Sequence, residues 1–199
     1  MELMEAIKER RSARKYFNKE IPEFIIEEML EAARLAPSGG NSQNRIFGII
    51  TNPELKKQLA EAAGNQMWIA TAPVVIACCV DISWDLAAAP PDDFGRIVNI
   101  LRFGHPFIKY LDQYPDRKAV RTLFENASPL IPAEHMLLVA ASHGLSGCFI
   151  GYLDIAKANK VLELPPNLSC LFLIPVGYSD DSSEQPQKKE LREICFYRK

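Results

Sequence analysis

The run from Pro73 to Val80 limits the possible folds more than any other feature of this sequence. It is continuously apolar and rich in β-branched residues. Such a run is typical of a strand covered on both faces, because a strand with one solvated face alternates apolar and polar residues. The whole apolar stretch from Ile69 to Val80 is too short for the roughly 20 residues that cross a bilayer. The sequence therefore predicts a buried central strand with helices against both faces, and no membrane partner.

The rest of the chain supplies further strands and helices around this run. Apolar residues recur at helical spacing in several segments, and Pro, Gly and capping residues mark their ends. We expect helices over residues 3–10, 22–36, 53–63, 130–143 and 155–164, and strands over residues 46–51, 73–80, 148–150 and 168–178. Because strands and helices alternate irregularly, we expect the α+β class, with a mixed central β-sheet flanked by helices.

Residues 82–128 are the least regular part of the sequence. Pro90-Pro91 interrupts them, and aromatic residues are scattered from Trp84 to Phe124. We interpret this region as an irregular excursion that carries one or two helices. Because no Gly/Ser-rich linker divides the chain, residues 1–199 are expected to form a single domain.

Charge and cysteine content argue against several functions. The formal net charge is −2, so there is no basic excess to attract nucleic acid or an anionic membrane, and any anion site must be local. The five cysteines show no CxxC motif and no zinc-like spacing with histidine. This pattern indicates core thiols in a reducing, cytoplasmic setting, with no metal site. The N-terminal residues mix charged and apolar side chains, unlike a secretory signal.

A basic cluster follows the first expected helix and reads Arg10-Arg11-Ser12-Ala13-Arg14. Guanidinium groups offer planar, charge-assisted donor pairs, and a serine hydroxyl adds a short hydrogen bond. The cluster therefore suits a phosphate monoester. Taken alone, it is equally compatible with a solvated basic loop.

Three other segments could approach a ligand. Ala36 to Gln43 combines small residues with Ser, Asn and Gln, which allows close backbone approach and contacts to a heterocycle edge, although an ordinary helix-ending turn has the same composition. His143 to Gly151 is glycine-rich but lacks the GxGxxG fingerprint, and its glycines could instead serve helix packing. The pair Lys188-Lys189 is, by itself, most simply a solvated surface pair.

Side chains for acid–base or nucleophilic catalysis are not evident. His105, His135 and His143 have no nearby Ser or Cys in a recognised setting, and neither a GxSxG motif nor a phosphate-binding loop occurs. The residues themselves therefore point to no catalytic side chain.

Taken in order, the four segments resemble the nitroreductase family of flavoproteins. The R-R-S-x-R motif is residues 10–14, and E-A-A-R-x-A-P-S-x-x-N-x-Q is Glu31 to Gln43. G-L-x-x-C-x-I-G is Gly144 to Gly151, and a P-V-G-Y strand, a basic pair and an apolar tail close the chain. The resemblance covers nearly the whole chain except residues 82–128. It implies a nitroreductase-like fold, a homodimer with shared sites, and the excursion near the substrate side.

The resemblance also implies roles for individual residues. Arg10 and Ser12 would bind the phosphate of FMN together with Lys188 or Lys189, and Arg14 would lie near the pyrimidine edge of the flavin. Residues 37–41 would reach the flavin of the other subunit. A backbone amide near Ile150 and Gly151 would approach the ring, and Gln66 would contact its O4 edge. The expected cofactor-binding residues are Arg10, Arg11, Ser12, Arg14, Pro37, Ser38, Gly39, Asn41, Gln66, Ile150, Gly151, Lys188 and Lys189.

The implied activity is hydride transfer from NADH or NADPH through FMN to a small organic acceptor such as a nitroaromatic or a quinone. Two alternatives remain open: a flavin-binding storage or sensing protein without turnover, and a same-fold reductive dehalogenase or dehydrogenase. The sequence departs from the family pattern at Asn44-Arg45, where Pro-Trp is usual, and at Tyr152, where a second glycine is common. The resemblance implies that Asn44-Arg45 changes the substrate pocket or its supporting packing, and that Tyr152 narrows the space beside the flavin ring.

Overall fold

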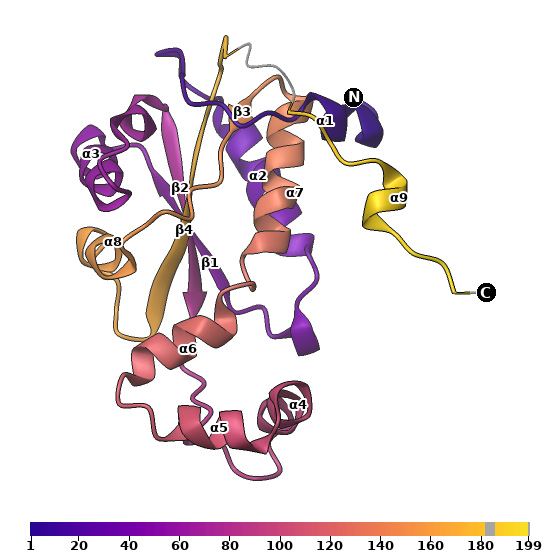
Figure 1. Ribbon diagram of the computed structural model, residues 1–199. Coiled ribbons are helices and arrows are strands. Elements are labelled where there is room, and N and C mark those ends of the chain that lie inside the picture. The colour runs from indigo at the N-terminus through magenta and orange to yellow at the C-terminus, as the bar shows by residue number, and fades with distance from the viewer. Residues whose placement is uncertain (182–185, 199) are drawn as a thin grey trace.

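A four-stranded sheet forms the centre of the computed structural model, which describes residues 1–181 and 186–198. The strand order is β1-β2-β4-β3, so the two longest strands are central. Figure 1 shows helices on both sides of this sheet. Expected strands at 46–51, 73–80 and 168–178 are confirmed, and the strands are β1 (Arg45–Ile50), β2 (Val74–Asp81), β3 (Ser146–Gly147) and β4 (Leu168–Gly177).

Strand β2 is buried on both faces, as the sequence predicts. Val75, Ala77 and Cys79 face one core, which they share with α3 (Pro53–Ala62), the short 3-10 helix η2 (Met67–Thr71) and α8 (Ile155–Val161). The alternate residues of β2 face a second core, shared with α2 (Glu23–Leu35) and α7 (Leu130–Ser142). The Asn52 side chain caps α3 by accepting from the backbone amides of Glu54 and Leu55.

The prediction of a mixed sheet is wrong for the described residues, because all three strand ladders are antiparallel. In the part of the chain that the structure describes, the one parallel pairing is an isolated bridge between Ser12 and Gly147. Strands joined through helices often run parallel, but the connection from β1 to β2 returns to the end of the sheet that it left. The connection from β2 to β3 crosses instead from the Asp81 end to the Val176 end, where β3 pairs with β4 and not with β2. The chain leaves β1 at Ile50 and enters β2 beside it, since Ile50 pairs with Val75.

The expected strand at residues 148–150 is also displaced. The paired residues are Ser146 and Gly147, and further along only Ile150 makes a bridge, to Leu173. The apolar character of residues 148–150 reflects burial of Cys148 and Ile150 in a core rather than continuous pairing. Cys78, Cys79 and Cys170 are buried as well, which confirms the expectation of core thiols for four of the five cysteines.

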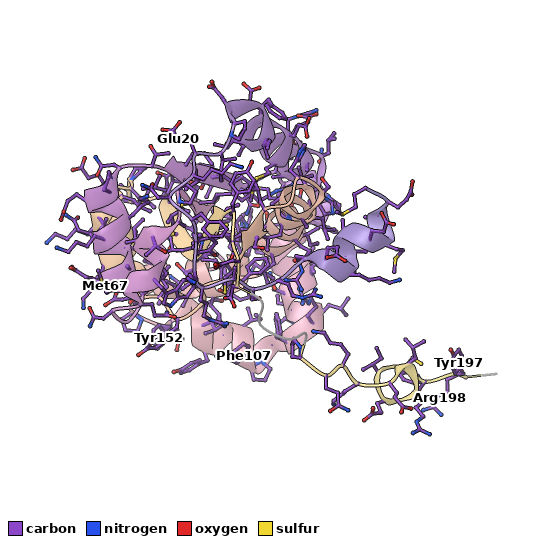
Figure 2. All side chains as sticks on the ribbon, turned by 90° about the horizontal axis from the view of Figure 1, so that it is seen from above. Glu20, Met67, Phe107, Tyr152, Tyr197 and Arg198 are labelled. Atoms are coloured by element: carbon purple, nitrogen blue, oxygen red, sulfur yellow. The ribbon has the colours of Figure 1, made fainter. Side chains whose placement is uncertain are left out.

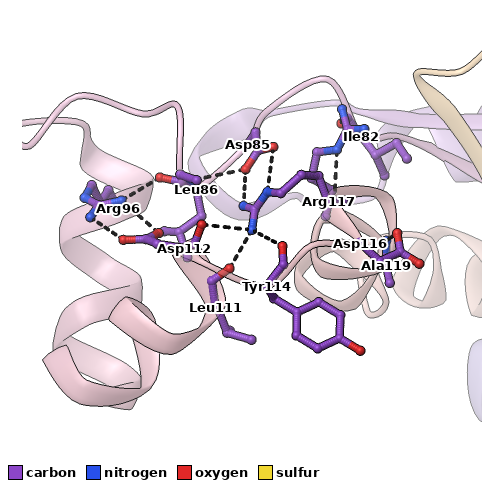
Figure 3. A network of polar contacts seen from close by, with 12 residues as sticks. Ile82, Asp85, Leu86, Arg96, Leu111, Asp112, Tyr114, Asp116, Arg117 and Ala119 are labelled. Atoms are coloured by element: carbon purple, nitrogen blue, oxygen red, sulfur yellow. Dashed lines mark hydrogen bonds and ion pairs between the residues drawn. The ribbon is translucent and has the colours of Figure 1, made fainter.

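The excursion contains three helices, α4 (Phe94–Phe103), α5 (His105–Asp112) and α6 (Arg117–Glu125), and is more regular than we predicted. Its apolar residues form a small core of their own around Leu86 and Ile108. Figure 3 shows the polar network that surrounds this core. Arg117 pairs with Asp85 and also donates to the Leu111 carbonyl, while Arg96 pairs with Asp112 at 2.8 Å. Single-residue patterns do not reveal such pairing between segments.

The two ends of the chain contribute short helices, α1 (Leu3–Glu9) and α9 (Leu191–Ile194), and α9 was not expected from the sequence. Helix α1 packs on α7. The segment carrying α9 stands away from the body, with Tyr197 and Arg198 at its outer end (Figures 1 and 2). Within residues 1–181 and 186–198, no helix combines the length and apolarity needed to cross a membrane.

Candidate functional site

The basic cluster is attached to the edge of the sheet. Ser12 forms a parallel bridge with Gly147 of β3, and the Ala13 amide lies 3.4 Å from the Gly147 carbonyl. A side chain at position 147 would not fit, since a Cβ there would lie 2.6 Å from Leu137 Cδ2. The glycine of the expected glycine-rich segment therefore allows α7 and β4 to pack closely around the strand that carries the basic cluster.

Three side chains that the sequence analysis missed fix this segment further. The buried Tyr16 hydroxyl lies 2.7 Å from the Ala13 carbonyl and 3.1 Å from the Pro175 carbonyl, and burial raises the pKa of Tyr16. On the other side, the Asp181 carboxylate accepts from the Arg14 amide at 2.9 Å, and Ser179 donates to the Lys15 carbonyl. The sequence does place Tyr16 directly after the basic cluster and Ser179 to Asp181 directly after the last strand, positions from which polar side chains could reach the cluster.

The side chains of the cluster point to different partners. Ser12 and Arg14 are exposed, and the Arg14 guanidinium lies 6.0 Å from the ring centre of Trp68. Arg10 lies 3.5 Å from the Glu134 carboxylate. Arg11 donates to the carbonyls of Lys8 and Arg10 at the end of α1, so its charge stabilises that helix terminus. The arrangement leaves the Ser12 side chain exposed and the Arg14 guanidinium accessible beside the Trp68 ring.

Several expected residues gather near this segment. Cys148 lies close to the basic cluster. Burial raises the pKa of its thiol, and the positive charge of Arg14 partly offsets that rise. Gln66 precedes Trp68 at the start of η2 and donates to the Ala63 carbonyl at 2.7 Å. Ile150 is buried, whereas Gly151 is exposed. Tyr152 is 77% exposed and its ring covers Gly64, so it packs on the η2 side rather than in the core.

The loop from Pro37 to Gln43 lies elsewhere. Gly39 and Gly40 line a cavity together with Asp81, at the end of β2 opposite to Val74. The basic cluster lies toward the Val74 end, because Gly147 and Val74 both pair with Val176. The eight residues of β2 span roughly 23 Å at the usual strand rise. Within one chain, these two sets of expected residues are therefore well separated (Figure 1).

Side chains of residues 38–45 hold this loop in shape. Ser38 Oγ accepts from the Gln43 amide at 3.1 Å, and Arg45 Nη2 donates to the Ala36 carbonyl at 2.5 Å. Asn41 and Gln43 adopt positive φ values of 53° and 48°. The loop thus has a defined, partly strained conformation rather than that of a simple helix-ending turn.

The cavity beside this loop has a volume of about 1200 Å³ and separates it from the excursion. Asn44 joins the two sides. Its amide group donates to Glu125 Oε2 at 2.7 Å and accepts from Ser128 Oγ at 2.7 Å. These contacts link positions more than 80 residues apart, which the sequence analysis did not anticipate.

The last two expected residues, Lys188 and Lys189, are exposed on the segment that leads to α9. Figure 1 shows that this segment leaves the body near α1 and α7. The structure therefore brings the basic cluster, Gln66, Ile150 and Gly151 into one region, and it places the 37–41 loop in another.

Comparison with known proteins assigns the chain to a family. The family model described as Nitroreductase family matches residues 7–178. A Methanothermobacter thermautotrophicus protein with the provisional name NADH dehydrogenase/NAD(P)H nitroreductase is 37% identical over 195 residues, which cover 96% of this chain and 83% of the relative. The chain belongs to the nitroreductase family.

Two further matches carry names of different activities. The structure of the NADPH:FMN oxidoreductase from Vibrio harveyi complexed with NAD+ superimposes with a TM-score of 0.74 at 25% identity, and covers 99% of this chain and 77% of that one. An iodotyrosine deiodinase from Haliscomenobacter hydrossis is 25% identical over 186 residues, with 91% and 82% of the two chains covered.

Replacing Tyr16 tests how the basic cluster is anchored. Tyr16→Phe removes the hydroxyl that serves two carbonyls, so we expect it to lower the free energy of unfolding by about 1–2 kcal/mol. It should also speed amide exchange in residues 10–16, because the segment loses its contact with β4. The matched control is Tyr114→Phe, at a partly exposed tyrosine of the excursion. Equal stability and exchange in both variants would contradict this account.

Proposed function

We propose that this protein is an FMN-dependent oxidoreductase that passes hydride from NADH or NADPH through bound FMN to a small organic acceptor, such as a nitroaromatic or a quinone. The observation that carries the proposal is the basic cluster fixed on β3 and β4, with Ser12 and Arg14 exposed, in a chain of the nitroreductase family. The names of the Vibrio harveyi and Methanothermobacter relatives support the same kind of activity.

The residues present fit FMN. Arg10 and Ser12 supply a charge-assisted donor and a hydroxyl for a phosphate monoester, at a point where the backbone is already fixed. Glu134 lies beside Arg10 and would share that guanidinium with the phosphate. Gly151 is exposed next to the buried Ile150, so a flat ring could approach the backbone there. Lys188 and Lys189, and Arg11 with its local carbonyl contacts, remain proposed ligands.

The protein's own residues position the cofactor and tune its charge. FMN supplies the hydride chemistry when it is bound. Arg14 would place a positive charge at the flavin edge, and its amide bond to Asp181 fixes the backbone from which that side chain extends. Gln66 would offer an amide to the ring. In this proposal none of these residues needs to move a proton.

We also propose that the working form is a homodimer with shared flavin sites. The 37–41 loop and the basic cluster are expected to touch FMN, yet they lie at opposite ends of β2 in one chain. In a dimer, the 37–41 loop of one copy could lie beside the basic cluster of the other copy, so that both contact the same FMN. Exposed apolar residues on α1 and on the α9 segment, such as Leu3, Met4, Leu191 and Phe196, supply surface for a large interface.

Light scattering tests the assembly. We expect the FMN-loaded protein to have twice the mass of one chain at micromolar concentration, because so much apolar surface is exposed in the monomer. Truncation before residue 190 should weaken the dimer, since it removes the exposed side chains of the α9 segment. A stable, FMN-loaded monomer would contradict the shared site.

Cofactor analysis and steady-state kinetics test the activity. The purified protein should be yellow, release FMN and not FAD on denaturation, and oxidise NADH or NADPH when menadione or a nitroaromatic is supplied. Bound FMN without NAD(P)H oxidation would favour the storage or sensing alternative. The deiodinase relative makes reductive dehalogenation a second candidate, so a halotyrosine belongs in the acceptor panel. A protein that neither carries nor binds FMN would disprove the proposal.

Two variants separate the roles of Arg10 and Arg14. Losing a charged contact to the phosphate should cost about 1.5–3 kcal/mol, so Arg10→Ala should weaken FMN binding by roughly tenfold to a hundredfold. Arg14→Ala should mainly lower the flavin reduction potential, because its charge favours the reduced, anionic ring. FMN titration and potentiometry measure the two effects. Arg34→Ala, at an exposed arginine paired with Glu31, is the matched control; behaviour like this control in both variants would place FMN elsewhere.

A further inference from the structure

The cavity between the 37–44 loop and the excursion has an aromatic wall. Trp84 contacts the ring of Phe124 edge-on, with ring centres 6.2 Å apart. Phe103 lies 6.3 Å from Phe124 and 6.0 Å from Phe107. All four rings line the cavity. Such a wall fits a flat apolar molecule, and the faces of these rings also attract positive charge.

Among the described residues, the charged side chains that line this cavity are mostly acidic. Asp81, Asp93 and Glu125 are half-buried carboxylates, whereas Arg102 is an exposed guanidinium. The Ser83 hydroxyl and amide, together with Asn167, lower the pKa of Asp81, which keeps it charged. With three negative groups and one positive group, the lining carries a net charge of −2.

Asn44 orients Glu125 without neutralising it. The Asn44 amide donates to Glu125 at 2.7 Å and is itself held by Ser128. An amide carries no charge, so the carboxylate keeps its field while its position at the cavity wall is fixed. The proline that is usual at position 44 in the family has no side-chain donor and could not make this contact.

Two ion pairs of the excursion lie outside the cavity lining. Arg96 bonds with Asp112, and Arg117 with Asp85, in the network of Figure 3. None of these four residues is part of the cavity lining in the described chain. Their charges offset each other locally, so these two pairs add little to the field of the acidic groups in the lining.

From the aromatic wall and the acidic lining we propose that the cavity is the acceptor site and selects neutral or cationic aromatic molecules over anionic ones. Only the word acceptor in this proposal rests on the proposed oxidoreductase function. The charge preference itself is a property of the cavity and holds for binding alone. Asn44 is a positioning residue that acts through Glu125.

A matched set of three nitrobenzene probes tests the charge preference. They are para-nitrobenzyltrimethylammonium, para-nitrobenzyl alcohol and para-nitrobenzenesulfonate, titrated calorimetrically into the full-length, FMN-loaded protein at low ionic strength. We expect the cation to bind on the order of tenfold more tightly than the sulfonate, with the alcohol between them. Salt should shrink the difference, since it screens charges at a partly open site.

Two variants locate the source of the preference. Glu125→Gln keeps an acceptor for Asn44 but removes the charge, and should weaken cation binding by roughly threefold while leaving the alcohol unchanged. Arg102→Gln should weaken sulfonate binding by roughly threefold without affecting the cation. Glu20→Gln, at an exposed glutamate outside the cavity (Figure 2), is the matched control and should change neither.

The outcomes separate this inference from the proposed activity. Equal binding of the three probes, tighter binding of the sulfonate, no measurable binding of the cation, or indifference to both cavity variants would overturn the charge selection. Tight, Glu125-dependent cation binding without NAD(P)H-driven reduction of the probe would support the charge selection and count against the oxidoreductase function. Reduction of all three probes with equal kcat/KM would leave the activity standing and remove the selectivity.

Discussion

Burial of β2 on both faces is the constraint on which the rest of this structure depends. Its side chains alternate between two cores, one with α3 and α8 and the other with α2 and α7. Because neither face is free, a ligand cannot lie on the middle of the sheet. The segments whose residues could bind a ligand are therefore found at the strand ends and the sheet edge, where backbone and polar side chains remain accessible.

This constraint separates two candidate functional regions along one strand. The basic cluster lies toward the Val74 end, fixed by Gly147, Tyr16 and Asp181. The cavity lies at the Asp81 end, between a short polar loop and the excursion. The first region has donors and positive charge, and the second has aromatic rings and carboxylates. A flavin phosphate and a neutral or cationic acceptor call for these opposite surroundings, and a two-fold arrangement of two chains would bring the two regions together.

Long-range polar contacts give both regions their shape. Asp181 reaches the Arg14 amide across 167 positions of sequence, and Asn44 reaches Glu125 across 81. Each contact is a single hydrogen bond to a carboxylate, worth on the order of 1–3 kcal/mol in net stability. Their importance lies in position: each one fixes a loop that carries charged side chains. Asn44 and Arg45, which depart from the family pattern, both make hydrogen bonds that hold the loop in place. Asn44 donates to Glu125, and Arg45 donates to the Ala36 carbonyl.

The sequence alone determined the buried strand at 73–80, the helices around it and the residues that resemble a flavin site. These follow from local periodicity, capping and motif spacing, which act over a few residues. Tertiary structure alone decided the antiparallel course of the sheet, the third helix of the excursion, the role of Tyr16 and the bond from Asn44 to Glu125. The physical reason is that strand direction and hydrogen bonding depend on which distant segments meet once the two cores are packed. A single sequence records the donors and acceptors, but only the folded chain pairs them.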